Sequence, residues 1–149
     1  IDNFSWNTAL SYDGNIMAIS SIKSNDNGND SGKVQIYRND NLGWQKIGND
    51  INGNINDYLG FSIALSYYGN IIAIGSIKNN SNTGNVKVYN FNGNNWIQLG
   101  DNINGEYKDN NFGWSVSLSG DGTILATSSI NYNNSTGYVK IYKYNGNTY

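Results

Sequence analysis

The chain has 149 residues, a formal net charge of −2 and a pI of about 4.8. Its nine Lys and Arg residues are scattered singly, so no basic stripe of the kind that binds nucleic acid is present. His and Cys are absent, which removes the commonest general base and the strongest nucleophile. No apolar run approaches the length of a membrane-spanning helix. We therefore expect neither an enzyme, nor a nucleic-acid-binding protein, nor a membrane span.

Asparagine is unusually abundant. The sequence contains 30 Asn residues, while hydrophobic residues make up 38% and charged residues 13% of the chain. Such a composition is found in disordered, prion-like segments, but it also results from codon bias in an AT-rich genome. The Asn residues lie mainly between apolar segments that keep a strict order, which favours a folded chain with Asn-rich turns.

One pattern of roughly fifty residues recurs three times. The six residues 11–16 (SYDGNI) return at 66–71 (SYYGNI) and at 119–124 (SGDGTI). We place the repeats at 2–56, 57–109 and 110–149, with the third incomplete, and treat the chain as a single repeat domain. A period of this length predicts a repeat architecture.

Each repeat contains short strand patterns in a fixed order. The first segment alternates large and small residues, a tight turn with Gly in second place follows, and the next segment is apolar almost throughout. A polar loop leads to a third alternating strand, and an aromatic residue opens the fourth. The expected strands are 4–11, 16–21, 33–37 and 44–48; 60–66, 71–76, 84–89 and 96–100; and 112–119, 124–129 and 138–142. No segment has a helical period, so we expect almost no helix.

This order predicts an all-β chain built from β-propeller blades, as three tandem four-stranded antiparallel repeats. A single blade leaves both faces uncovered, and stacking blades around an axis buries them. Small residues on the first strands, such as Ser62 and Ala64, suit a crowded position near that axis. An open β-solenoid and a β-sandwich are the alternative folds.

Two segments carry a family resemblance. Residues 96–105 read W-x-Q-L-G-x-x-I-x-G, and residues 112–122 read F-G-x-S-V-x-L-S-x-D-G. With their counterparts elsewhere in the chain, they resemble FG-GAP-type repeats, the blades of integrin α-chain-like propellers. The Phe-Gly pair is intact at Phe112-Gly113, whereas the other repeats have Phe4-Ser5 and Leu59-Gly60. Kelch repeats are similar in length, but their paired glycines are missing.

The resemblance implies a propeller with a role in adhesion or protein interaction at an extracellular or virion surface. Three copies cannot close a ring of ordinary blade geometry, which needs four to eight blades. We therefore expect further blades in a longer protein, closure by association of chains, or an open stack that polymerises.

Integrin-type blades often carry a calcium loop, and the nearest counterpart here is residues 25–30 (NDNGND). Asp26 and Asp30 are the candidate calcium ligands, helped by Asn carbonyls, because calcium binds six to eight oxygens. A flexible polar loop is the alternative interpretation. Asp57 and the segment 50–54 form a weaker calcium pattern. We expect no other cofactor and no catalytic residues.

Tyrosines on the turns are the candidate binding residues: Tyr12, Tyr67 and Tyr68. Two other aromatic positions recur, Trp44 with Trp96, and Phe61 with Trp6 and Trp114. Recurrence favours core packing for these two sets over a sugar-stacking platform.

Three functional hypotheses follow. The first is a non-enzymatic interaction or adhesion propeller that binds a protein through its inter-strand loops. The second is a structural subunit whose blades assemble between chains into a filament or shell. The third is a lectin-like glycan binder, which the Asn-rich loops beside the turn tyrosines would suit.

Overall fold

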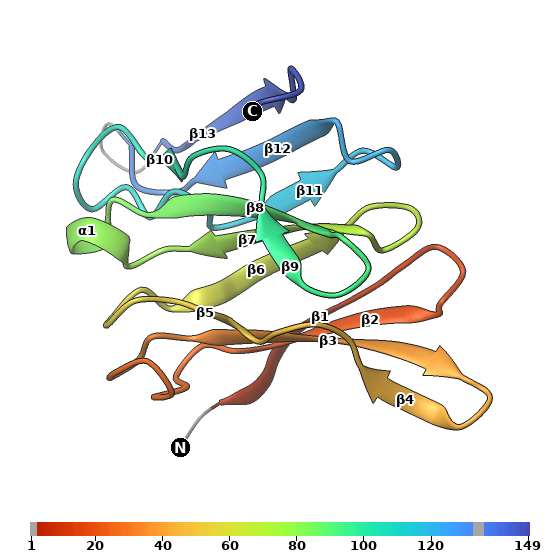
Figure 1. Cartoon of the computed structure of the whole chain (residues 1–149). Coiled ribbons are helices and arrows are strands. Elements are labelled where there is room, and N and C mark those ends of the chain that lie inside the picture. The colour runs from red at the N-terminus through yellow and green to blue at the C-terminus, as the bar shows by residue number, and fades with distance from the viewer. Residues whose placement is uncertain (1–2, 133–135) are drawn as a thin grey trace.

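The computed structural model describes residues 3–132 and 136–149 and consists of three antiparallel β-sheets stacked in an open arrangement (Figure 1). Strands account for 49% of the chain and helix for 3%, which confirms the all-β prediction. The first sheet contains β1 (Phe4–Leu10), β2 (Ile16–Ser21), β3 (Lys33–Asp40), β4 (Gly43–Lys46) and β5 (Ile51–Asn52). The second contains β6 (Leu59–Leu65), β7 (Ile71–Ser76), β8 (Asn85–Phe91), β9 (Trp96–Gln98) and β10 (Ile103–Asn104). The third contains β11 (Val116–Leu118), β12 (Ile124–Ser129) and β13 (Tyr138–Lys143).

In each of the first two sheets, the outer edge consists of two short strands that lie end to end. In the first sheet, β4 pairs with the second half of β3 and β5 with its first two residues, Lys33 and Val34. In the second sheet, β9 and β10 divide the edge of β8 in the same way. Sequence patterns did not predict β5 and β10, because a two-residue strand has no measurable period. The expected fourth strand is therefore an interrupted one.

The second strand of each repeat has the bounds that the sequence predicts, whereas β11 is shorter than the expected 112–119. The start of that segment is hydrogen-bonded less regularly, to two other segments of the same chain. The N–H of Phe112 donates to the carbonyl of Thr83 at 3.0 Å, and the N–H groups of Gly113 and Trp114 both donate to the carbonyl of Ser128, at 3.0 and 3.2 Å. Regular pairing with β12 begins only at Val116.

Helix is confined, among the described residues, to α1 (Asn79–Asn82), and Asn80 and Ser81 inside it have positive φ. It is a single turn in the loop between β7 and β8. No helix in the described part of the chain has the length and apolar character needed to cross a membrane.

The core lies in two layers between the sheets. Strand β6 packs against β1 and β2 on one side and against β11 on the other (Figure 1). The first layer buries side chains of the first and second sheets, including Ile36, Leu59 and Ile74. The second layer buries side chains of the second and third sheets, including Phe112 and Leu125. Each sheet is thus stabilised by its neighbours, since apolar burial dominates folding.

At each interface between successive sheets, a glycine before the third strand is in backbone contact with the first large residue of the next repeat. Gly32, before β3, forms an isolated parallel bridge with Leu59, the first residue of β6, and Gly84 does the same with Phe112. Both glycines have positive φ, and a Cβ on either would lie 2.2 Å or less from the carbonyl oxygen of its partner residue. Only glycine allows this contact, because any side chain would overlap backbone.

Trp96 connects the second sheet to the first. Its ring is 3% exposed, its indole N–H donates to the carbonyl of Ile47 at 3.2 Å, and its backbone N–H donates to Oδ1 of Asn49 at 2.8 Å. Trp44 occupies the same repeat position on the first sheet but is 42% exposed. The prediction of core packing at this position is therefore confirmed for Trp96 and wrong for Trp44, because in the described chain no sheet covers that side of the first sheet.

The glycine contact predicts a difference between two similar substitutions. Gly84→Ala and Gly14→Ala place a Cβ at nearly equal φ, +79° and +73°, but Gly14 has open space where Gly84 meets Phe112. Both should lose about 1 kcal/mol to backbone strain. Gly84→Ala should lose a further 1–3 kcal/mol, roughly, from the overlap. Urea denaturation of the two variants measures the difference, and equal losses would contradict the proposed role of the close approach.

The two tryptophans give a second matched pair. Trp96→Ala should lower the free energy of unfolding by about 3–5 kcal/mol, because it removes a buried ring and leaves a cavity. Trp44→Ala should cost less than Trp96→Ala by about 2 kcal/mol, because Trp44 is 42% exposed and its removal leaves no enclosed cavity. Thermal or chemical denaturation of both variants checks this, and a similar loss in each would show that Trp44 packs as tightly as Trp96.

Candidate functional site

Three tyrosines meet at the hairpin turns that follow β1 and β6. Tyr12 stacks on Tyr67 with ring centroids 4.4 Å apart and an interplanar angle of 16°, and Tyr68 meets Tyr67 edge to face at 4.8 Å. Tyr12 is 77% and Tyr68 75% exposed. We call these three residues the turn tyrosine cluster. The structure thus brings all three sequence-predicted candidates together on one surface.

Backbone hydrogen bonds between sheets hold the cluster in place. The N–H of Tyr12 donates to the carbonyl of Tyr67 at 3.0 Å, and the N–H of Tyr67 donates to the carbonyl of Gly120 at 2.7 Å. The turns of all three repeats are therefore connected in a row. The tyrosine rings are carried by a backbone that the sheet stacking fixes, and a surface fixed in this way loses little entropy on binding.

Aspartate side chains brace two of the three turns. In the first, the hydroxyl of Ser11 donates to Oδ1 of Asp13 at 2.6 Å and the N–H of Asn15 donates to the same oxygen at 3.0 Å. These hydrogen bonds, that from Ser11 first, lower the pKa of Asp13 to about 2. Asp121 accepts equivalent bonds from Ser119 and Thr123, which lower its pKa to about 2 as well.

The second turn replaces the aspartate with Tyr68. Here the hydroxyl of Ser66 donates to Oδ1 of Asn70 at 3.0 Å, so an amide two residues further on takes the role of the carboxylate. The turn keeps its geometry, with Gly69 at positive φ, while the aspartate position is released for an aromatic side chain. This exchange creates the exposed ring of Tyr68.

A second group of aromatic rings lies near the start of the first strands. Phe61 stands between Trp6 and Trp114, with centroid distances of 5.6 and 4.8 Å, and the indole N–H of Trp6 donates to the carbonyl of Phe61 at 3.2 Å. Trp6 and Trp114 are exposed. The prediction that this recurring position packs in the core is therefore wrong for both tryptophans. Their recurrence reflects contact between neighbouring first strands, at a partly open surface that sequence patterns did not identify.

The candidate calcium ligands have other partners. Asp26 forms an ion pair with Lys33 at 2.7 Å, and the hydroxyl of Tyr58 donates to Asp30 at 3.3 Å. Among the residues that the structure describes, no three His, Cys, Asp or Glu side chains are grouped as metal ligands would be. Calcium binding here stays a prediction, and it would require Asp26 to exchange Lys33 for the metal. The weaker candidate Asp57 accepts hydrogen bonds from the N–H of Asn54 and the amide of Asn79.

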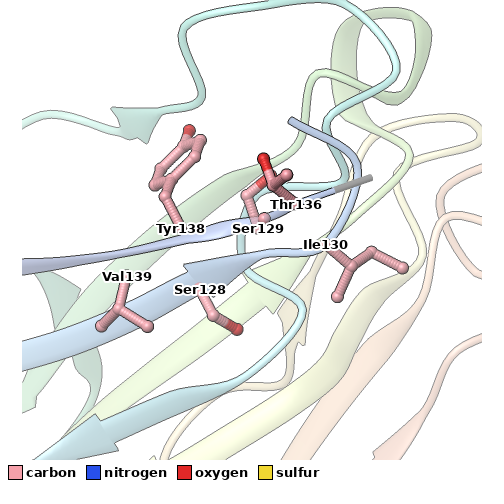
Figure 2. Close-up of a pocket in the computed structure, with 7 residues that line it drawn as sticks. Ser128, Ser129, Ile130, Thr136, Tyr138 and Val139 are labelled. Carbon is pink, nitrogen blue, oxygen red and sulfur yellow. The ribbon is translucent and has the colours of Figure 1, made fainter. Parts of the chain in front are cut away.

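Two surface hollows lie away from the turn tyrosine cluster. One, of about 340 Å³, is lined by Asn27, Asn54 and Ile55 beside the candidate calcium loop. The other, of about 470 Å³, lies on the third sheet beside β12 and β13 (Figure 2). Neither is lined by a charged residue, and both combine hydrogen-bonding side chains with an isoleucine.

Comparison with known proteins informs the fold alone. No protein-family model and no curated protein matches the chain. Among solved structures, the chain is similar to a protein described as Kuenenia stuttgartiensis hydrazine synthase, with a TM-score of 0.58 and 13% sequence identity. The match covers 93% of this chain and 45% of that one, so the present chain spans less than half the length of that protein. The FG-GAP resemblance stays a prediction.

The braced turns predict a pH effect. The pKa of Asp13 and Asp121 is about 2 in the folded chain against an ordinary value of 3.8. A lowered pKa stabilises the fold above the ordinary value and ceases to do so as the pH falls through about 2. A D13N/D121N variant should therefore melt below the wild type at pH 5, and the gap should close by about pH 2.

The second turn supplies the control for this prediction. Asn70→Ser removes the amide that accepts from Ser66, but no titrating group is involved. Its effect on the melting temperature should not vary over the same pH range. Melting curves followed by circular dichroism measure both variants. A gap for D13N/D121N that is unchanged between pH 5 and pH 2 would contradict the role of the two carboxylates.

Proposed function

We propose that this chain is a non-enzymatic protein-interaction module of the β-propeller type, which recognises its partner through the turn tyrosine cluster. The observation that carries the proposal is the row of turns itself. Three adjacent sheets present their hairpins side by side, and the rings of Tyr12 and Tyr68 stand in solvent on a fixed backbone. Exposed aromatic residues on a rigid support are typical of binding hot spots.

Propeller geometry is supported by the way the sheets repeat. Each uses its first strand as the contact nearest the next sheet, β1 against β6 and β6 against β11, and its last strands form the outer edge. This order of strands is that of a propeller blade. An adhesive role at an extracellular or virion surface rests on the sequence resemblance to FG-GAP-type repeats.

A lectin-like role is the second candidate, favoured by the same rings. A sugar ring binds by stacking on an exposed aromatic face, with amide groups hydrogen-bonding its hydroxyls. Asn15 and Asn70 lie on the two turns that carry Tyr12 and Tyr68. These amides also take part in bracing the turns, since Asn15 donates to Asp13 and Asn70 accepts from Ser66. Fewer of their groups are therefore left for a ligand, which favours a protein partner.

Selection from a peptide library displayed on phage tests the proposal. Enriched peptides should bind the wild-type chain and lose affinity by about thirtyfold or more for Y12S/Y68S, because a single aromatic anchor contributes about 2 kcal/mol or more. Tyr107→Ser is the matched control, since Tyr107 is an exposed tyrosine that contacts Tyr132 away from the cluster. All three chains should keep the same melting temperature within a few degrees.

Two outcomes would contradict the proposal. Peptides that bind Y12S/Y68S as well as the wild type would place recognition elsewhere. Strong signals on a glycan array that Y12S/Y68S abolishes, with no peptide enrichment, would favour the lectin-like role instead.

A further inference from the structure

The third strand of each sheet carries two β-branched residues on one face, and their burial differs between sheets. These residues are Val34 and Ile36 on β3, Val86 and Val88 on β8, and Val139 and Ile141 on β13. The first four are at most 1% exposed, whereas Val139 is 67% and Ile141 73% exposed. The face that each of the first two sheets buries against the next sheet is therefore open on the third sheet.

The hollow on that face stands where an anchoring residue fits in the other interfaces. Leu59 reaches Gly32 of the first sheet, and Phe112 reaches Gly84 of the second. Gly137 holds the equivalent place before β13, also with positive φ, and it lines the 470 Å³ hollow together with Ile130 and Val139. Figure 2 shows Val139 and Ser128 pointing to one side of β12 and β13, and Tyr138 to the other.

The opposite end of the stack presents the complementary residues. Phe4 takes the repeat position of Leu59 and Phe112, yet it is 64% exposed, whereas both of those are fully buried. Leu10 and Trp44 on the same sheet are exposed too, and Trp44 is the counterpart of the buried Trp96. The first sheet thus offers the residues that anchor one sheet on the preceding one.

The turn glycines give an independent match. A Cβ on Gly69 would lie 2.6 Å from Ile16, and one on Gly122 would lie 2.5 Å from Ile71, so each turn packs on the preceding sheet. Gly14, the first of the series, has nothing within 4 Å. Ile124, the counterpart of Ile16 and Ile71, is exposed on the third sheet. Gly14 on the first sheet and Ile124 on the third are therefore the two partners of such a contact, and neither makes it within the chain.

We infer that the open face of the third sheet binds the first sheet of a second copy of this chain, head to tail, in the geometry of the internal interfaces. Phe4 of one copy enters the hollow at Gly137 of the other, its turn at Gly14 covers Ile124, and its first sheet buries Val139 and Ile141. Such a contact uses two different surfaces, so it closes into a ring or extends into a filament according to the rotation between copies.

One residue of the first sheet, Ser5, differs from its counterparts in the other repeats, and this difference provides a further test of the inferred contact. Ser5 stands where the other repeats have Gly60 and Gly113, at which a Cβ would lie 2.6 Å from the preceding sheet. Ser5 keeps their positive φ, so its backbone has the docking conformation, but its Cβ meets the partner copy. The contact between copies is therefore weaker than the internal ones, and Ser5→Gly should strengthen it.

Sedimentation velocity of the whole chain over a wide concentration range tests the inference. The wild type should associate reversibly, and Ser5→Gly should lower the dissociation constant about tenfold, because relieving an overlap returns about 1–3 kcal/mol. V139E/I141E should weaken association about a hundredfold or more, since it buries two carboxylates without partners. Leu42→Glu, at the exposed tip of the β3–β4 hairpin, is the matched control and should associate as the wild type does.

A crosslinking experiment keeps the result independent of stability. The chain has no cysteine, so Phe4→Cys in one copy and Val139→Cys in another introduce one thiol each. Mixed under oxidising conditions, the two should form a heterodisulfide faster than Phe4→Cys pairs with Leu42→Cys. Wild type and Ser5→Gly that both stay monomeric would overturn the inference and would mean that a different sheet covers this face. Association that survives V139E/I141E, or crosslinking without preference, would overturn it too.

Discussion

The close contact between a glycine and the large apolar residue that opens the next sheet is the constraint on which the stack depends. At Gly32 three segments of backbone meet, because its carbonyl accepts from the N–H of Gly53 at 3.0 Å while Leu59 forms a parallel bridge beside it. Gly84 repeats this arrangement with Gly105 and Phe112. The end of one repeat, the start of the next and the third strand are thus fixed together. Since backbone meets backbone there, small changes in side-chain packing cannot shift one sheet along another.

This constraint connects the core to the candidate site at the other end of the first strands. Once Leu59 and Phe112 are placed, β1, β6 and β11 run side by side and their turns lie in a row. The row depends little on which side chains the turns carry. The exchange of an aspartate for Tyr68, with Asn70 accepting from Ser66 instead, leaves the turn intact. A fixed framework with exchangeable turn residues is the usual basis of a recognition surface.

The sequence reveals those features whose cause is local. The bounds of β2, β7 and β12 follow from segments that are mostly apolar and from the turns before them. The turn positions of Tyr12, Tyr67 and Tyr68 follow from Gly14 and Gly69. The stacking of Tyr12 on Tyr67 could not be predicted, because it requires the two turns to lie in neighbouring sheets. The different burial of Trp44 and Trp96 has the same origin: one residue type at one repeat position meets a sheet in one case and solvent in the other.

Position in the stack therefore explains the exposed surfaces better than composition does. Val139 and Ile141 are as apolar as the buried residues at the same positions, and fully burying such side chains contributes about 1.5–3 kcal/mol each. Because both side chains are exposed to water, covering them with another sheet of complementary shape would be favourable. Ser5 opposes this, because its Cβ lies where the two internal interfaces have only hydrogen. In the inferred contact between copies, attraction across two apolar side chains is set against the overlap of one Cβ. We therefore expect that contact to form and dissociate, whereas the internal interfaces have glycine at this position and no such overlap.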